Sequence, residues 1–280
     1  MITQLATSMA VEIAERRAGR IGSSVYAGRA LRLVERNLFA FRSTNWLVMV
    51  SGFVEPVFYL LSFGLGIGQL VGNLTDGAGH PVSYAAYIAP ALLATSAMNG
   101  AIYDSTWNVF FKMHFERLYQ AWLATSVGTL DVALGEILWA LIRGLAYAIG
   151  FLAVMGVMGL IHSPWALLAV PGAVLIAFGF ASVGMGVTSY LSNFHQMHWV
   201  NFFLLPMFLF SGTFYPITVF PVWMQVIIGA LPLNHAVELE RNLMLGNLSW
   251  ATAGHALYFV VMVTLGLYFT TKRLAALFQR

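Results

Sequence analysis

Long apolar runs separated by short polar segments make up most of this chain. A transmembrane helix needs about 20 predominantly apolar residues, and five runs are close to or above that length. These runs are residues 46–68, 84–105, 132–160, 166–191 and 253–271. The pattern therefore predicts an all-α integral membrane protein.

A sixth apolar stretch is interrupted by prolines. Residues 199–214 form a run of 16 residues, which is about 24 Å of helix against a bilayer core of about 30 Å. Prolines stand within and after this run at positions 206, 216, 221 and 232. A helix break exposed to lipid would leave backbone groups without hydrogen bonds. We therefore expect a fifth span followed by short helices around 222–230 and 233–245, which form a re-entrant hairpin over residues 215–246. A plain apolar outer loop is the alternative.

The first 45 residues are more polar and carry seven of the 14 lysines and arginines. Leu31, Val34, Leu38 and Phe41 follow helical spacing, and arginines occupy another face. This pattern is typical of an amphipathic helix on the membrane surface, and a solvated arm is the alternative. The expected organisation is a basic arm with an interfacial helix (1–45), a six-helix transmembrane domain (46–271) and a short cytoplasmic tail (272–280).

Composition and charge support a membrane protein. Only 9% of the residues are charged, against about 25% in an ordinary soluble domain, and the mean hydropathy is +0.77. The net charge of +3 comes largely from the N-terminal arginines, so it indicates a membrane surface and no nucleic-acid partner. If both termini are cytoplasmic, the inner segments hold twelve of the 14 basic residues, which is a positive-inside pattern.

Several kinds of chemistry are missing from the sequence. It contains no G-x-x-x-x-G-K-[ST] motif, so we do not expect a nucleotide to bind in a P-loop of this chain. It has no cysteine, which excludes thiolate metal sites and cysteine nucleophiles. His195 and His198 are three residues apart without a carboxylate nearby in sequence, so we expect neither a metal nor a cofactor in this chain.

Four charged residues fall within the predicted spans, where a charge is costly and is a functional hypothesis by default. Glu55 lies in the middle of the first span beside Pro56, and Asp104 lies near the inner end of the second. Glu136 and Arg143 are seven residues apart in the third span, too far for a direct pair. A structural role is favoured for these last two, whereas functional and structural roles are equally supported for Glu55.

Residues 108–131 form the main inner segment and mix aromatic residues with Lys112, Glu116 and Arg117. This composition suits a helix at the cytoplasmic interface that offers one face to a partner protein. A connecting loop with charged residues at the membrane surface explains it equally well.

Three stretches of sequence resemble the permeases of type-2 ABC transporters. They are FERLYQAWLATSVGTLDVALGE (115–136), FSGTFYP (210–216) with FPVW (220–223), and LPLNH (231–235) with Arg241 and Gly246. Within that superfamily the chain is most similar to the NodJ branch of lipo-oligosaccharide exporter permeases, and drug exporters are more distant. The resemblance covers about residues 30–270.

The resemblance implies six spans, an N-terminal interfacial helix, a coupling helix between spans two and three, and a re-entrant hairpin before span six. It also implies a permease homodimer that works with two separate ABC ATPase subunits, to which ATP and Mg²⁺ would bind. The expected location is the bacterial inner membrane, with both termini in the cytoplasm.

In an exporter of this kind we assign roles to three sets of residues. The segment that couples to the ATPase is Phe115, Glu116, Arg117, Leu118, Thr125, Ser126 and Thr129. The substrate pathway is Glu55, Pro56, Phe202, Phe203 and Phe210, although an aromatic belt at the membrane interface also explains the phenylalanines. The outer gate is Phe214, Tyr215, Pro216, Pro232, His235 and Arg241.

The expected function is therefore that of a permease subunit, without an ATPase site of its own, in an ATP-driven exporter. Its substrate would be amphipathic: a lipid-linked glycan, a lipo-oligosaccharide or a hydrophobic drug. One alternative is a secondary transporter driven by protons through Glu55 and Asp104. Another is a membrane-embedded enzyme that acts on lipids through His195, His198 or His235.

Overall fold

The structure, a computed structural model, describes residues 26–42, 47–71, 73–75, 79–116, 118–123, 125, 127–161 and 163–278. Most of the predicted N-terminal arm lies outside these residues. So do Arg117 and Ser126, two of the residues assigned to the coupling segment.

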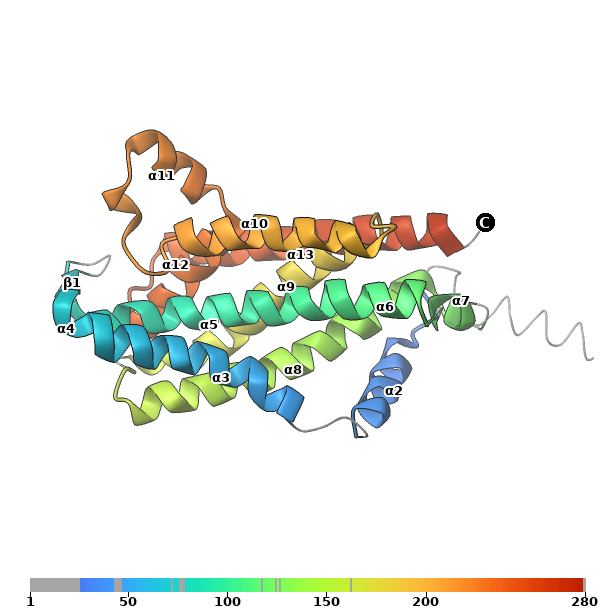
Figure 1. The fold of residues 1–280 in the computed structure, drawn as a ribbon, viewed down its shortest axis with the longest axis horizontal. Coiled ribbons are helices and arrows are strands. Elements are labelled where there is room, and N and C mark those ends of the chain that lie inside the picture. Colours follow the sequence, from blue (N-terminus) through green and yellow to red (C-terminus); the bar gives the residue numbers. More distant parts are fainter. Residues whose placement is uncertain are drawn as a thin grey trace, which may run out of the picture.

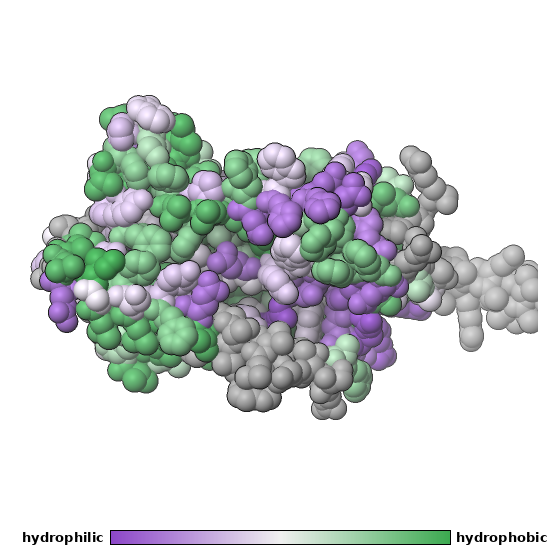
Figure 2. Space-filling model, in the orientation of Figure 1, coloured by the Kyte–Doolittle hydropathy of each residue, from purple (hydrophilic) through white to green (hydrophobic). Residues whose placement is uncertain are grey.

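Long helices run side by side along one axis of the molecule (Figure 1). They are α3 (Leu47–Leu61) with η1 (Ser62–Ile67) and α4 (Gly68–Val71); α5 (Tyr84–Tyr103) with η2 (Asp104–Asn108) and α6 (Val109–His114); α8 (Thr129–Val157); η3 (Pro164–Leu168) with α9 (Ala169–Thr188); η4 (Phe194–Gln196) with α10 (Met197–Phe210); and α13 (Trp250–Phe278). Figure 2 shows hydrophobic residues over much of this bundle, and hydrophilic residues concentrated toward the end that holds α2 and α7. An apolar band with a polar end is the surface expected of a membrane domain.

Short elements close the two ends of the bundle (Figure 1). The polar end holds α2 (Ala30–Arg42) and α7 (Leu118–Leu123). The opposite end holds β1 (Asn73–Thr75), β2 (Pro81–Ser83), η5 (Ile217–Val219), α11 (Val222–Gly229) and α12 (Pro232–Leu245). It is called the outer end below, after the orientation that the sequence predicts. The two strands form an antiparallel hairpin in which Leu74 pairs with Val82, an element that the hydrophobic pattern did not predict.

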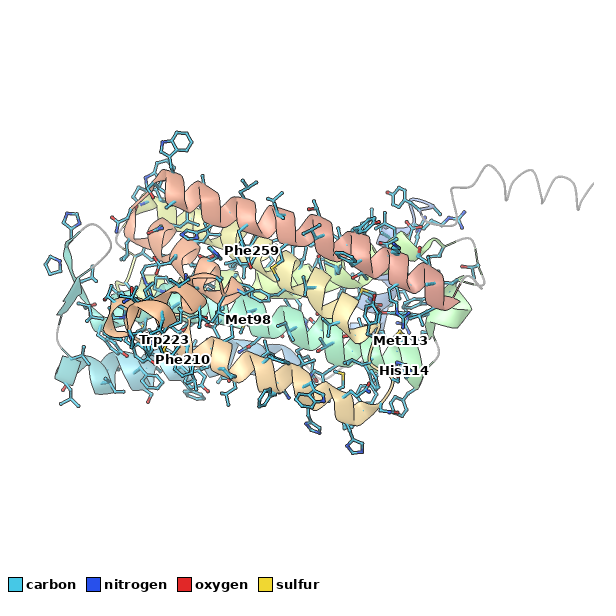
Figure 3. All side chains as sticks on the ribbon, turned by 90° about the horizontal axis from the view of Figure 1, so that it is seen from above. Met98, Met113, His114, Phe210, Trp223 and Phe259 are labelled. Atoms are coloured by element: carbon cyan, nitrogen blue, oxygen red, sulfur yellow. The ribbon has the colours of Figure 1, made fainter. Side chains whose placement is uncertain are left out.

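Helix α9 forms the centre of the core and packs against α5, α8 and α13. Figure 3 shows α10 and α13 on opposite sides of the bundle, with Phe259 of α13 directed inward. Phe259 is fully buried and lies so close to α9 that a Cβ on Gly179 would be 2.7 Å from its Cδ1. Small residues that allow close helix approach are the usual means of packing helices in membranes.

The closest backbone approach of α13 to α9 yields a stability prediction. A Cβ on Gly266 would lie 2.7 Å from the Ser182 Cβ and 2.9 Å from the Ser182 carbonyl carbon, and a backbone atom cannot rotate away. We expect Gly266→Ala to lower the free energy of unfolding by about 1–3 kcal/mol, as overpacking does. Gly254→Ala on the same helix meets no atom within 4 Å and should leave stability unchanged in detergent unfolding. Equal stability of the two variants would contradict the close packing of α9 on α13.

The predicted all-helical membrane fold is confirmed. Among the described residues, five helices are long and apolar enough to cross a membrane, or six if the bent pair α11 and α12 counts as one span. These two helices meet at 83° and both lie at the outer end (Figure 1), which is the geometry of the predicted hairpin. Helix α10 has only 14 residues, about 21 Å. It lies along the same axis as the long helices (Figure 1), so we take it as the fifth crossing helix.

Helix α2 also has the predicted amphipathic character. It packs against α8 through Ala30, Leu33 and Asn37, which are buried, whereas Leu31 and Leu38 are exposed on another side. The exposed leucines belong to the face that the sequence predicted to contact lipid.

Candidate functional site

A cavity of about 800 Å³ lies between α3, α5, α8 and α10. Apolar, aromatic and polar side chains line it together, and only Glu55 and Arg143 among them are charged. The lining residues are Glu55, Pro56, Tyr59, Leu92, Thr95, Ser96, Asn99, Gly100, Ile102, Tyr103, Trp107, Arg143, Tyr147, Asn201, Leu204, Leu205 and Phe208. A volume of this size and a mainly apolar wall with a few polar groups are typical of a site for a drug-sized ligand. We call it the central cavity.

Glu55 and Pro56, two residues of the predicted substrate pathway, lie on the wall of the central cavity. The Glu55 side chain is exposed, and within the described part of the chain it forms no hydrogen bond or ion pair. Proline at position 56 is inside α3, and the π-helical segment η1 begins six residues later, at Ser62. Glu55 thus presents a carboxylate inside α3 for which the described residues supply no partner.

The second charged residue of the central cavity is neutralised by an ion pair. Arg143 of α8 binds the carboxylate of Asp104 through a very short Nη2–Oδ1 contact. The Asn108 side-chain amide donates to the same carboxylate at 2.7 Å. Asp104 begins the π-helical turn η2, and such turns are frequent at functional sites. The ion pair therefore joins α8 to the bend of the α5–α6 helix beside the central cavity.

A second ion pair, toward the polar end of the bundle, connects three helices. Lys112 Nζ of α6 lies 2.6 Å from Glu136 Oε2 of α8 and donates to Asn37 Oδ1 of α2 at 3.4 Å. Glu136 and Arg143 thus have separate partners, as their spacing required, and each partner lies on the α5–α6 helix.

Asp131 ties α2 to the start of α8. Its carboxylate accepts hydrogen bonds from the backbone N–H groups of Gly128 at 2.9 Å, Ala27 at 2.6 Å and Arg29 at 2.9 Å. A carboxylate at this position satisfies N–H groups that a helix N-terminus otherwise leaves free. Asp131 was not among the site residues predicted from the sequence, although an acidic residue in the first turn of a long apolar helix is a recognisable capping signal.

The described residues of the predicted coupling segment lie at the polar end of the bundle (Figure 1). Phe115 and Glu116 are exposed directly after α6, and Thr125 is exposed after α7. Leu118 is half-buried, whereas Thr129 at the start of α8 is fully buried. The segment therefore offers a surface at residues 115–116 and 125 and a buried anchor at Thr129.

Two aromatic residues of α7 that the sequence analysis did not select connect the coupling segment to α2. Tyr119 is fully buried, and its ring stacks on that of Trp122 with centroids 5.4 Å apart. The Arg36 guanidinium of α2 lies 5.3 Å from the centroid of the Trp122 ring. The spacing of three residues between Tyr119 and Trp122 places both on one side of a helix, and this is the signal that was available in the sequence.

Arg241, a predicted gate residue, is buried at the outer end and makes three interactions. Its Nη1 donates to Glu238 Oε1 at 2.6 Å, and its Nη2 donates to the carbonyl oxygen of Gly212 at 2.8 Å. The guanidinium also lies 3.9 Å from the ring centroid of Tyr87. Arg241 therefore connects α12, α5 and the turn after α10.

The other predicted gate residues also gather at this end. Phe214 packs against Phe63 of η1 and Phe208 of α10, with ring centroids 4.9 and 5.2 Å apart. The Tyr215 hydroxyl donates to the Leu209 carbonyl oxygen at 3.1 Å. Pro216 directly precedes η5, and Pro232 is the first residue of α12.

The last predicted gate residue, His235, belongs to a small cluster between α12 and α13. Its Nδ1 is 2.7 Å from Nδ1 of His255, and its ring stacks on that of Tyr258 at 4.2 Å. Among the described residues no three His, Cys, Asp or Glu side chains lie close enough together to hold a metal ion.

The three phenylalanines assigned to the substrate pathway do not line the central cavity. Phe202 and Phe203 are 62% and 69% exposed on α10, and Phe210 packs against Phe220 at 5.8 Å. Helix α10 instead contributes Asn201 and Phe208, among others, to the wall. Asn201 and Asn99 were not predicted as site residues, although amide side chains inside apolar runs are an identifiable signal of a polar site.

Comparison with known proteins supports a common family. Residues 30–245 match the ABC-2 type transporter family. The chain is 32% identical over 217 residues to Nodulation protein J of Rhizobium leguminosarum bv. viciae, an alignment that covers 77% of this chain and 82% of that protein. It is 32% identical over 221 residues to Nodulation protein J of Sinorhizobium fredii (strain NBRC 101917 / NGR234), covering 79% and 82%.

A protein of Escherichia coli extends the comparison beyond nodulation proteins. The inner membrane transport permease YadH of strain K12 is 28% identical over 206 residues, which cover 71% of this chain and 77% of YadH. The family match extends from α2 through the helical hairpin of α11 and α12, called the outer hairpin below, and so includes the walls of the central cavity. The chain therefore belongs to the ABC-2 type transporter family and is a multi-span membrane permease of that family.

Proposed function

We propose that this chain is the membrane permease subunit of an ATP-driven exporter. It moves an amphipathic substrate out of the cytoplasm or the inner leaflet of the bacterial inner membrane. The observation that carries this proposal is the central cavity, which combines aromatic, apolar and polar walls inside a permease of the ABC-2 type. A lipid-linked glycan, a lipo-oligosaccharide or a hydrophobic drug is an amphipathic substrate of this kind.

In this proposal two ABC ATPase subunits drive the movement, and ATP and Mg²⁺ bind to them. The sequence holds no P-loop of its own, and the exposed Phe115 and Glu116 offer the partner a surface. A movement of this surface reaches α2 through the contact of Trp122 with Arg36. It reaches α8 through the hydrogen bonds that Asp131 and Glu136 accept. ATP drives export because it has a higher affinity for one of the two states of the transporter.

We also propose that two copies of the permease face each other through α10 and α3. Trp199, Phe202 and Phe203 of α10 are exposed, as are Phe58 and Leu65 on the helix formed by α3 and η1. A second copy would cover these side chains and close the central cavity on its open side. The substrate would reach the cavity from the inner leaflet between the two copies.

The outer hairpin gates the exit in this proposal. Arg241 and Phe214 hold the turn after α10 against α5, α12 and η1, so opening the exit requires these contacts to separate. The gate thus lies at the end opposite the coupling segment (Figure 1). Both chain termini are cytoplasmic in this orientation, in agreement with the positive-inside distribution of the basic residues.

Co-purification tests the proposed function. The chain is expressed together with the genes that neighbour its own, purified in mild detergent, and assayed for co-eluting subunits and for ATP hydrolysis. We expect a stoichiometric ATPase subunit. A pure permease without an ATPase, together with transport that stops when the proton gradient is collapsed, would contradict the proposal.

The coupling segment gives a more specific prediction. Glu116→Ala combined with Arg117→Ala should lower ATP-driven transport at least tenfold, because both charges belong to the segment that we assign to the ATPase. Membrane insertion and expression should not change. Glu35→Ala, at an exposed position of α2, is a matched surface control. Unchanged transport by the double variant would refute the assignment.

A further inference from the structure

The charges around the central cavity do not balance. Two charged side chains line it, Glu55 and Arg143. Arg143 is already paired with Asp104, so its positive charge is compensated within the protein. Glu55 has no hydrogen bond or ion pair in the described part of the chain, and the cavity therefore carries one uncompensated negative charge.

We propose that the central cavity binds amphiphiles that carry a positive charge, and that Glu55 is the counter-ion that selects them. This inference rests on the proposed transport function, since it takes the central cavity to be the place where substrate binds. A carboxylate inside the membrane domain is unfavourable unless it is paired. A cationic ligand would supply the missing partner, whereas an anionic ligand would add a second negative charge beside the first.

The aromatic side chains of the cavity favour the same ligand. Tyr59 lies one helical turn after Glu55 and thus on the same side of α3. Tyr103, Trp107 and Tyr147 line the wall formed by α5, η2 and α8. Aromatic ring faces attract cations, most strongly where water is excluded. The cavity therefore combines one carboxylate with several rings, a set of groups that suits an ammonium or amidinium ion.

The remaining walls suit the rest of an amphiphilic ligand. Leu92, Leu204 and Leu205 supply apolar surface, and Asn99 and Asn201 supply amide oxygens that accept hydrogen bonds from N–H groups. The volume of about 800 Å³ lies within the range of sites for drug-sized ligands.

A pair of fluorescent probes that differ only in charge tests the proposal. Monodansylcadaverine carries a primary amine that is protonated at pH 7.5, and its N-acetyl derivative is neutral with the same ring and chain. Binding is measured by dansyl fluorescence on the purified full-length permease in nanodiscs of phosphatidylcholine, a lipid without net charge, with empty nanodiscs as the blank. We expect the amine to bind at least tenfold more tightly than its acetylated form.

Variants of Glu55 test whether this residue causes the preference for the amine probe. Glu55→Gln should reduce the affinity for the amine about tenfold and leave that for the acetylated probe unchanged. Glu55→Asp should retain the preference for the amine. Glu35→Gln, which removes an exposed carboxylate on α2 far from the cavity lining, should bind both probes as the wild type does.

Three results would overturn the proposal: equal affinity of the wild type for both probes, no binding of either probe, or an unchanged preference in Glu55→Gln. Thermal unfolding of each variant confirms that it is folded before binding is measured. The assay needs no ATPase, so its failure is distinct from failure of the proposed function. A complex that hydrolyses ATP and exports without a charge preference refutes only this inference.

Discussion

Replacing Arg143 by methionine is expected to lower the free energy of unfolding by about 3–5 kcal/mol, the usual cost of breaking a buried ion pair by removing one partner. The side chains of Arg143 and Asp104 are only 10% and 5% exposed. Methionine fills much of the space of arginine, but it leaves the Asp104 carboxylate with Asn108 as its remaining side-chain donor. Equilibrium unfolding in mixed detergent micelles measures the loss.

Two further variants show whether the charge is the cause. Asp104→Asn combined with Arg143→Met removes both charges and should recover more than half of the lost stability. Arg32→Met breaks an exposed ion pair with Glu35, whose partners are 78% and 54% exposed, and should change stability by less than about 1 kcal/mol. A single Arg143→Met variant as stable as Arg32→Met would contradict a structural role for the buried pair.

Arg241→Lys is expected to lower ATP-driven export at least tenfold and to destabilise the protein by about 2–4 kcal/mol. Lysine keeps the positive charge, but a single ammonium cannot reach Glu238 and the Gly212 carbonyl while it also lies flat over the Tyr87 ring. The outer hairpin would then lose its attachment to α5. Export into vesicles that contain the permease and its ATPase, together with thermal unfolding, measures both effects.

Neighbouring substitutions separate the contacts of Arg241. Tyr87→Phe keeps the aromatic face and should behave as the wild type, whereas Tyr87→Leu removes it and should weaken export. Glu238→Gln keeps a hydrogen-bond acceptor at a position that is 33% exposed, and its effect should be smaller than that of Arg241→Lys. Wild-type export by Arg241→Lys would show that the hairpin is not held through this residue.

The positions of the helices could be predicted because a helix that crosses a membrane must be apolar over about 20 residues. Residues 84–105 and 132–160 were predicted as spans, and the structure has helices over Tyr84–His114 and Thr129–Val157. Proline spacing likewise predicted the bent pair α11 and α12. The hairpin of β1 and β2 was not predicted, because strands of three residues leave too short a pattern to recognise.

The candidate site was predicted only in part. Glu55 and Pro56 stood out because a charge and a proline are rare within an apolar run, and both line the central cavity. Phe202 and Phe203 were selected for their residue type alone, and their exposure on α10 depends on how that helix is rotated. Asn99 and Asn201 lie about a hundred positions apart, and only their helices bring them to one cavity.

The sequence by itself determined that this is a membrane protein with long crossing helices and a proline-bent helix pair, because hydrophobicity and prolines act locally along the chain. Its likeness to known permeases, and not the hydrophobic pattern, indicated the family. The tertiary structure alone decided which charges are paired. Arg143 finds Asp104 and Glu136 finds Lys112, each on another helix, while Glu55 faces the central cavity without a partner in the described chain. Ion pairing depends on distances between helices, and those distances follow from helix packing and rotation, which no single stretch of sequence specifies.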